Sequence, residues 1–420
     1  MTAVHTAIYW FRSDLRLRDN PTFIKACKEA EFLLPVYIHS NHLEEEAAWG
    51  FPRVGGQRKA FLQESLEDLR TQLRAMGSDL VELSGDILEV FEELRTKLDA
   101  NQIYCEQIKA PEELEQVAIL SHAGFELKSI WQSSMLDPQD LPFKAEDMPD
   151  VFTQFRQQVE KHKIRFAKPV DAPVSIPPLP SSHRVQDQAT TFDASSSKKS
   201  FLGGETSALA HINQYFERRL PDTYKQTRNG LVGMDYSSKF SLWLAGGCCS
   251  ARLIAKQLAE YELLYGANDG TYWLWFELLW RDYFRFLHFK FGNKLYRSRG
   301  LGAAPSNQFN EAKFQQWASG NTGESLIDAG MRELSTTGYL SNRMRQVVAS
   351  YWIYNMKGDW RAGAAWFESQ LIDYDVYSNQ GNWLYIAGKG TDPRGGRPFN
   401  VAKQTQDHDP DAIYRNMWLK

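Results

Sequence analysis

Two aspartates, Asp373 and Asp375, belong to a short segment in which carboxylates, amides and aromatic rings stand side by side. The segment covers residues 371–383 and also carries Asn379. In irregular or strand-like backbone, side chains two residues apart point to the same side, so both carboxylates can accept hydrogen bonds from the N–H groups of one flat ligand. The sequence therefore predicts a polar binding wall, with a surface loop of turn-forming residues as the alternative.

Two other segments place charged, amide and aromatic side chains among apolar helix formers, residues 277–285 and 336–346. Glu277 and Trp280 are three residues apart, so on a helix they share one face. A Trp at helical spacing is more often part of a core than of a site, and a binding role for Trp280 depends on the polar residues around it.

These segments resemble the photolyase/cryptochrome flavoproteins, and within them the cryptochrome DASH branch. The resemblance covers nearly the whole chain, because several long motifs occur in the same order. It implies a blue-light-dependent flavoprotein. The motifs are residues 10–20, 203–209, 228–231, 235–241, 272–284, 331–338 and 371–382.

The resemblance implies a folded FAD inside a helical domain. Hydroxyl groups and backbone N–H groups at the start of a helix bind phosphate oxygens well, which suits the FAD diphosphate. A helix cap with nothing bound is the alternative reading of the two serines. The residues expected to hold the diphosphate are Ser237, Ser238, Lys239, Phe240 and Ser241.

Other residues are expected to contact the rest of FAD. By resemblance, Arg345 and Asp373 form an ion pair against the flavin ring, Asp375 accepts from a ring N–H, and Asn379 faces flavin N5. An amide at that position can hydrogen-bond without titrating. A buried Arg–Asp pair is costly to stability, which favours a functional reading. The remaining expected cofactor contacts are Tyr224, Glu277 and Arg281.

The resemblance also implies a substrate, DNA that contains cyclobutane pyrimidine dimers. Damage weakens stacking and pairing, so a dimer is extruded more cheaply than an intact step, and single strands avoid most of that cost. The expected catalytic residues are Glu277, Trp280, Asn342, Gln346, Asn379 and Tyr385. Cations that can track phosphates, or simply form a solvated charged loop, are Arg343, Lys389, Arg394, Arg397 and Lys403.

Two positions depart from the resembled pattern. Trp383 and Trp360 stand at the proximal and middle positions of an electron relay, but the distal position, where the family has Trp, falls on Asn307. Gln380 also replaces a Trp that DASH members carry. An amide cannot donate an electron, so photoreduction is expected to end at a substitute donor. The candidates nearest in sequence are Trp317, Tyr351 and Trp352.

The resemblance also implies a second chromophore. Glu106 ends an expected strand, where the resemblance places a contact for a reduced folate antenna, 5,10-methenyltetrahydrofolate. The residues that follow, 107–111, differ from the family pattern.

The first third of the chain alternates short apolar β-rich runs with helical patterns, which predicts a doubly wound parallel sheet. Such sheets open their ligand crevice at the carboxyl ends of the strands, here at residues 10–20. The expected strands are residues 7–11, 32–39, 79–83, 102–105 and 126–131.

The pattern divides the chain into an α/β antenna-type domain, residues 1–133, a connector, 134–200, and an all-α FAD-binding catalytic domain, 201–420. The connector is rich in Pro and Ser and contains one helical stretch, residues 151–162. The fold class is therefore α/β plus all-α.

Composition limits the function classes. The 420 residues carry a net charge of −4, so any affinity for DNA must come from a local basic face. The start of the chain lacks a signal peptide pattern and no apolar run spans a bilayer, so we expect a cytoplasmic monomer. The four cysteines have no metal-binding spacing, so we expect no metal.

Three functions follow in order of support. The first is a lyase that repairs pyrimidine dimers, mainly in single-stranded DNA, by electron donation from reduced FAD. The second is a blue-light receptor of the same fold with little or no repair, which has no physical need for Glu277, Trp280 and Asn342. A nicotinamide-dependent dehydrogenase is disfavoured because no Gly-x-Gly-x-x-Gly follows the first expected strand.

Overall fold

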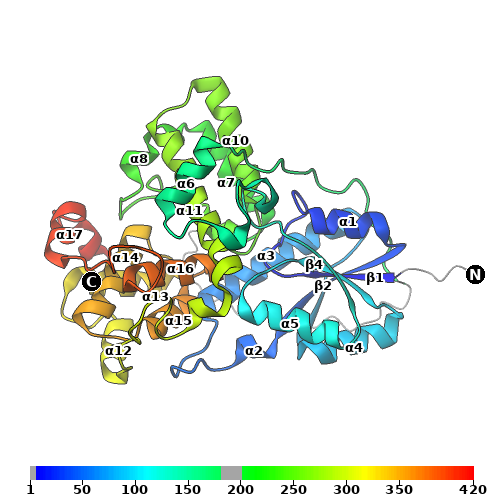
Figure 1. Cartoon of the computed structure of the whole chain (residues 1–420), viewed down its shortest axis with the longest axis horizontal. Helices are drawn as coiled ribbons and strands as arrows, with labels where there is room; N and C mark the ends of the chain where they lie inside the picture. The colour runs from blue at the N-terminus through cyan, green and yellow to red at the C-terminus, as the bar shows by residue number, and fades with distance from the viewer. Residues whose placement is uncertain (1–5, 181–200) are drawn as a thin grey trace, which may run out of the picture.

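The computed structural model describes residues 6–180 and 201–420. A parallel sheet with its helices forms one end of the molecule, and a larger group of helices forms the other (Figure 1). The described N-terminal end lies at the sheet, and the C-terminus lies among the helices of the opposite end.

All five strands of the sheet are parallel, in the order β3-β2-β1-β4-β5. This confirms the predicted doubly wound sheet. Its third strand starts two residues later than predicted, after Asp79, whose carboxylate accepts from the Leu80 backbone N–H at 2.8 Å. The strands are β1 (Thr6–Phe11), β2 (Phe32–Ser40), β3 (Val81–Gly85), β4 (Gln102–Glu106) and β5 (Glu126–Ile130).

Alternating side chains of β1 face two different cores. Tyr9 and Phe11 face the core shared with the helical domain, whereas Ile8 and Trp10 face a smaller core of their own. Helices α1 (Pro21–Glu29) and α3 (Gly56–Ala75) contribute to the first core, and α4 (Ile87–Leu98) and α5 (Pro111–His122) to the second; α2 (Asn41–Glu44) is one short turn.

The connector is more structured than a linker. Its described part contains two short 3-10 helices, η1 (Pro138–Asp140) and η2 (Ala145–Asp147), and helix α6 (Phe152–Lys161), close to the predicted 151–162. Both η2 and α6 pack against α11 (Asp269–Phe291) of the helical domain. Residues 181–200, which include the Ser-rich run, lie outside the described residues.

The described residues from 201 onward form helices without a strand, as predicted. The central α11 starts at an Asn268–Thr271 capping box and ends at Gly292. No helix in the described parts of the chain is long and apolar enough to cross a membrane. The other described elements from residue 201 onward are α7 (Glu205–Glu217), η3 (Leu220–Thr223), α8 (Tyr224–Thr227), α9 (Ser241–Ala245), α10 (Ala251–Tyr265), η4 (Gly292–Tyr296), α12 (Glu311–Ala318), α13 (Ser325–Thr337), α14 (Asn342–Ser350), η5 (Tyr351–Asn355), α15 (Trp360–Gln370), α16 (Val376–Ala387), α17 (Val401–His408) and α18 (Ile413–Trp418).

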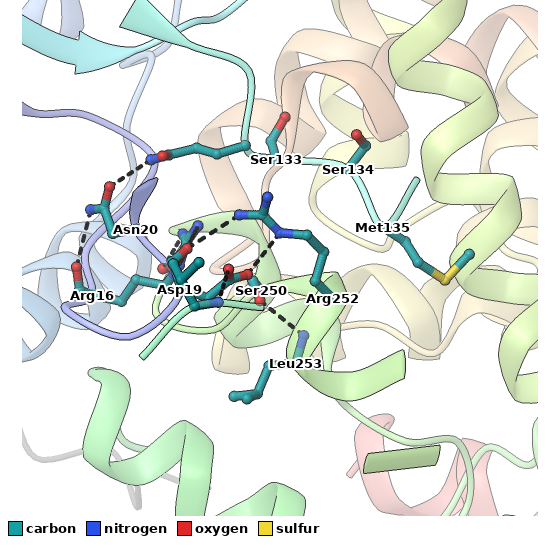
Figure 2. Close-up of polar contacts among 12 residues, drawn as sticks. Arg16, Asp19, Asn20, Ser133, Ser134, Met135, Ser250, Arg252 and Leu253 are labelled. Atoms are coloured by element: carbon teal, nitrogen blue, oxygen red, sulfur yellow. Dashed lines mark hydrogen bonds and ion pairs between the residues drawn. The ribbon is translucent and has the colours of Figure 1, made fainter. Parts of the chain in front are cut away.

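The two domains meet where the loop after β1 reaches the start of α10 (Figure 2). Arg252 pairs with the Asp19 carboxylate at 2.8 Å, and Arg16 donates to the carbonyl oxygens of Asp19 and Gly247, both at 2.9 Å. Gly247 has φ +70°, and a Cβ there would lie 1.9 Å from the Ser13 carbonyl oxygen. Only glycine permits this approach, which fixes the crevice of the sheet against the helical domain.

Candidate functional site

The loop that precedes α9 is strained in a way typical of ligand-binding loops. Ser237 and Lys239 both have φ of 59°, a left-handed conformation that costs free energy in residues other than glycine. The imidazole of His211 and the carbonyl oxygen of Ser238 lie 2.9 Å apart and help to hold the loop. Because α9 has only five residues, the loop itself, rather than a long helix starting at Ser241, is the phosphate-binding candidate.

Lys239 is a buried ammonium group in this loop. Its side-chain nitrogen lies 3.1 Å from the ring centroid of Tyr236 and has no hydrogen-bond partner among the described residues. Burial lowers the pKa of Lys239 to about 7, although Glu333 opposes the shift. A buried cation without an acceptor fits an anionic ligand, so this loop fits the diphosphate of FAD.

The Arg345–Asp373 ion pair that the sequence predicts is present. Arg345 Nη2 lies 2.9 and 2.8 Å from the two carboxylate oxygens of Asp373, and this carboxylate is fully buried. Arg345 also donates from Nε to the Leu340 carbonyl oxygen at 2.9 Å, which fixes the guanidinium plane. The pair lies near Lys239, so the expected ring and phosphate contacts belong to one region. Its contact with a flavin ring stays a prediction.

Asp375 has a partner that sequence reasoning missed, Arg285. The two form a buried ion pair, and Asp375 also caps α16 by accepting from the Ser378 backbone N–H at 2.7 Å. Burial alone would raise the pKa of Asp375, but Arg285 and Arg281 outweigh it and hold the pKa at about 2. The two aspartates of the predicted wall are thus held by different arginines. The available signal was the spacing of Arg281 and Arg285, one helical turn apart.

Arg281 joins three parts of the chain. Its guanidinium donates to the carbonyl oxygen of Leu244 in α9 at 3.1 Å and to that of Ser133 in the connector. The neighbouring Asp282 accepts from the backbone N–H groups of residues 135 and 136 at 2.9 and 2.8 Å. Tyr224 is buried at the start of α8. These contacts place the expected cofactor residues around α11, and their contact with FAD stays a prediction.

Trp280 and Tyr385 form a corner beside Glu277. Their rings are 5.6 Å apart between centroids and meet edge to face at 77°. Glu277 and Trp280 share one face of α11, as their spacing predicts, and Glu277 forms an ion pair with Arg228. Burial raises the pKa of Glu277, against the effect of Arg228. The corner combines two aromatic surfaces with one carboxylate.

Helix α14 carries two further residues that are expected to bind the substrate. Asn342 is exposed at its first turn, and Gln346 accepts from Arg343 at 3.3 Å. Arg343 also donates to the Asn229 side chain at 3.1 Å, next to the Arg228 that holds Glu277. The loop after α8 thus links the expected substrate residues of α11 to those of α14.

The expected relay residues Trp383 and Trp360 are both buried. Asn307, at the expected distal position, donates from its amide to the backbone carbonyl oxygens of Ile353 and Gly358 at 3.3 and 3.1 Å. Its side chain therefore has a structural role in the turn that follows η5.

Two of the substitute donors named from sequence lie beside Trp383. The centroid of the Trp317 ring is 6.4 Å from that of Trp383 and 5.3 Å from that of Trp352. The Trp317 and Trp352 rings are stacked, with an angle of 29° between their planes. A Cβ on Gly363 would lie 2.2 Å from a Trp383 ring atom and 3.0 Å from a Trp352 ring atom. Glycine at this position is what allows both the Trp383 ring and the Trp352 ring to pack against residue 363.

A cavity of about 550 Å³ lies between the sheet crevice and the helical domain. Its wall includes Trp10 and Trp49 from the first domain, and Trp360, Asn379 and Gln380 from the second. The Asn379 amide donates to the Ala364 carbonyl oxygen at 3.0 Å. Asn379, the expected flavin N5 contact, thus lines the cavity between the sheet crevice and the helical domain.

Glu106 does end β4, as expected, but it lines a smaller cavity of about 100 Å³, together with Arg281 and Asp375. Burial, with a contribution from Asp14, raises the pKa of Glu106 to about 8. One of its carboxylate oxygens has no hydrogen-bond partner among the described residues. Its contact with a folate stays a prediction.

Comparisons with known proteins agree with this arrangement. Residues 7–177 match the family model for DNA photolyase, and residues 273–420 match the FAD binding domain of DNA photolyase. A cryptochrome DASH from Gloeobacter violaceus is 43% identical over 99% of this chain and 85% of its own length. The crystal structure of a Synechocystis cryptochrome superimposes with a TM-score of 0.93 at 42% identity, covering 100% of this chain and 89% of that one. A class III photolyase from Agrobacterium tumefaciens gives 0.83 at 26% identity, with 100% and 87% covered.

The matches confirm the resemblance inferred from sequence, and with it the fold class. FAD is the cofactor of the matched helical domain, and the buried, unpartnered Lys239 gives that domain a cation suited to its diphosphate. With relatives of this identity aligned over nearly its whole length, the chain belongs to the photolyase/cryptochrome family of flavoproteins, in the cryptochrome DASH branch.

Proposed function

We propose that this protein is a light-driven lyase that splits cyclobutane pyrimidine dimers in DNA, mainly in single strands. The observation that carries the proposal is the corner of Trp280 and Tyr385 with Glu277 at its side. Trp280 and Glu277 lie on the same helix as Arg281, an expected flavin contact, and Arg285, which pairs with the expected flavin contact Asp375. A receptor that does not bind DNA lesions has no need for such a corner.

The roles of the chain in this reaction are binding and orientation. Trp280 and Tyr385 offer a ring face and a ring edge to two linked bases, which cannot be coplanar with each other. Glu277, held by Arg228, accepts hydrogen bonds from the base edges. Asn342 and Gln346 of α14 add amide groups that can also bond to the bases. Bound and reduced, FAD supplies the electron that opens the dimer under blue light.

The cations expected to contact phosphate differ in how far their side chains are already bound by other groups of the protein. Arg394 and Arg397 both pair with Asp392, and both donate to the Tyr385 hydroxyl group. Lys389 donates to the backbone at residues 304 and 305. We assign phosphate contact first to Arg394, whose side chain remains 65% exposed. Contact between Arg394 and the DNA backbone supports binding of single strands by charge and stacking rather than by base sequence.

The alternative is a blue-light receptor with residual DNA binding. It uses the same flavin region, so FAD content and light response do not discriminate between the two functions. The corner formed by Trp280, Tyr385 and Glu277, called the lesion corner below, does discriminate between them, because only repair requires a substrate to enter it.

The deciding experiment is blue-light turnover of a dimer-containing oligothymidine by protein whose flavin has been reduced beforehand. We expect restored thymine absorbance with single-stranded substrate, and slower turnover with duplex, because the duplex must also be unpaired and unstacked. A dark sample and an undamaged oligothymidine are the controls. No turnover on either substrate, with full FAD content, would favour the receptor.

A further inference from the structure

Phe152 lies face to face on Trp280. The ring centroids are 3.7 Å apart and the planes differ by 13°, the shortest centroid distance among the aromatic pairs of the described residues. Phe152 opens α6 and so belongs to the connector, whereas Trp280 lies in the middle of α11. The connector therefore covers one face of Trp280 from behind.

The start of α6 is fastened to α11 on both sides of this stack. Lys290 pairs with Asp150 at 2.7 Å and donates to the Met148 carbonyl oxygen at 2.6 Å. Tyr283 donates its hydroxyl group to the Asp150 carbonyl oxygen. These contacts hold the chain immediately before Phe152 in place.

A further pair of contacts fixes the other end of α6. Arg156 donates to the Tyr272 hydroxyl oxygen at 2.7 Å, and that hydroxyl group lies 2.8 Å from Glu160. The helix is thus bound along most of its length, and Phe152 is buried under it. Phe152 is a fixed surface rather than a mobile side chain.

The stack leaves Trp280 with one covered face. Tyr283, Phe284 and Tyr385 approach the indole at 5.5, 5.4 and 5.6 Å between centroids, at 90°, 41° and 77°, so none of them is stacked on it as Phe152 is. The Trp280 side chain is partly exposed. An indole without such support samples several rotamers, and ordering it on binding costs free energy.

We propose that Phe152 is a positioning residue that holds the Trp280 indole ready to stack on the extruded dimer. This role rests on the proposed function. It makes the connector part of substrate binding, so that Phe152 acts on DNA through Trp280 without contacting the DNA itself.

The chain offers a matched control in Phe155, one helical turn later. Phe155 is fully buried and contacts the rings of Tyr283, Phe286 and Phe152 at 5.6, 6.1 and 6.5 Å between centroids. Its ring makes no such contact with Trp280 within the described structure. A loss of packing alone should affect Phe155→Leu at least as much as Phe152→Leu.

Binding of FAD-loaded protein to a single-stranded, dimer-containing oligothymidine is measured in the dark by fluorescence anisotropy. We expect Phe152→Leu to weaken binding about 2- to 10-fold, the scale of one aromatic pair, with FAD content unchanged. Phe152→Tyr keeps the ring and should restore the affinity. Phe155→Leu should lower the thermal midpoint without changing the affinity. Equal loss of affinity in the two Leu variants would overturn the proposal.

A double-mutant cycle with Trp280→Ala tests whether the effect passes through the indole. We expect Phe152→Leu to cause no further loss of affinity in the Trp280→Ala background. An undiminished loss there overturns the positioning role. Wild-type affinity in Trp280→Ala would instead overturn the lesion corner of the proposed function, so the two failures are distinguishable.

The stack is also measured without DNA. In protein labelled with fluorotryptophan, the Trp280 resonance is identified by its absence from Trp280→Ala. We expect this resonance to shift or broaden in Phe152→Leu and to stay unchanged in Phe155→Leu. An unchanged resonance in Phe152→Leu would mean that Phe152 does not hold the indole, and would overturn the proposal.

Discussion

At the residue scale, the region expected to bind the flavin contains buried charges whose pKa values are far from their ordinary range. Lys239 is a lysine with a pKa of about 7, and Asp375 is an aspartate with a pKa of about 2. The cause differs: burial dominates for Lys239, whereas two arginines outweigh burial for Asp375. The first group needs a partner, and the second already has one.

The lowered pKa of Lys239 predicts pH-dependent FAD binding. An anionic diphosphate favours the ammonium form and raises its pKa, so FAD binding takes up a proton above pH 7, and affinity falls as pH rises. We expect a loss of up to about tenfold per pH unit between pH 7 and 9, the limit for one proton. Titration of FAD into FAD-free protein measures it.

The control for this prediction is Lys239→Arg, because a guanidinium group stays charged throughout this range. Its FAD affinity should be nearly independent of pH. The same slope in both proteins would show that another group takes up the proton.

Replacing Asp375 by Ala should remove most of the FAD and also destabilise the protein. The change leaves a buried Arg285 unpaired and removes the cap of α16, which costs about 3–5 kcal/mol in the free energy of unfolding. Flavin absorbance and urea denaturation measure the two effects. Asp375→Asn keeps the cap and an acceptor, so it separates the effect of charge from that of geometry. Full flavin retention in Asp375→Ala would remove this residue from the site.

At the element scale, α11 carries both residues expected to bind FAD and residues expected to bind the lesion. Arg281 is an expected FAD contact and Arg285 pairs with Asp375, while Trp280 directly precedes Arg281 and Glu277 lies one turn earlier. The capping box at the start of α11, together with α8, η2 and α16 packed against this helix, fixes the axial position of all four side chains. We expect a change at Trp280 to leave the residues expected to hold FAD in place.

Changing Trp280 to Ala tests this separation. We expect lesion binding to weaken by about 1–3 kcal/mol, the scale of aromatic–base stacking, with flavin content unchanged. Dark binding to a dimer-containing oligothymidine and flavin absorbance are the measurements. Unchanged repair at limiting substrate would mean that Trp280 is a core residue and would strengthen the receptor alternative.

At the scale of the whole molecule, the question is where an electron from outside enters. The family's relay would run from Trp383 through Trp360 to a distal Trp, but Asn307 stands at that position and is bound to backbone carbonyl groups. Trp317 and Trp352 form a buried stack, and Trp317 of this stack lies beside Trp383. A positive charge on Trp383 can spread to this stack, although both rings lack contact with solvent.

We therefore expect photoreduction of oxidised FAD to be inefficient, with a short-lived Trp radical in transient absorption. Asn307→Trp should lengthen the radical lifetime and increase net reduction. Trp317→Phe should shorten the lifetime further if the buried stack holds the charge, and Trp366→Phe serves as a matched control. A long-lived radical in the unmodified chain, unaffected by Asn307→Trp, would place the terminal donor elsewhere.

The sequence by itself determined the order of elements and the family. Alternating apolar runs indicated five parallel strands, because side-chain period depends on local backbone geometry, and the i, i+3 spacing put Glu277 and Trp280 on one helical face. Pairings between distant segments were decided by the tertiary structure: Asp375 with Arg285, Glu277 with Arg228, and the stacking of Phe152 on Trp280. No local pattern encodes such pairs, since they depend on which surfaces meet when the helices pack. The connector shows this most clearly, because its composition predicts a linker and only packing places Phe152 of the connector on the Trp280 ring.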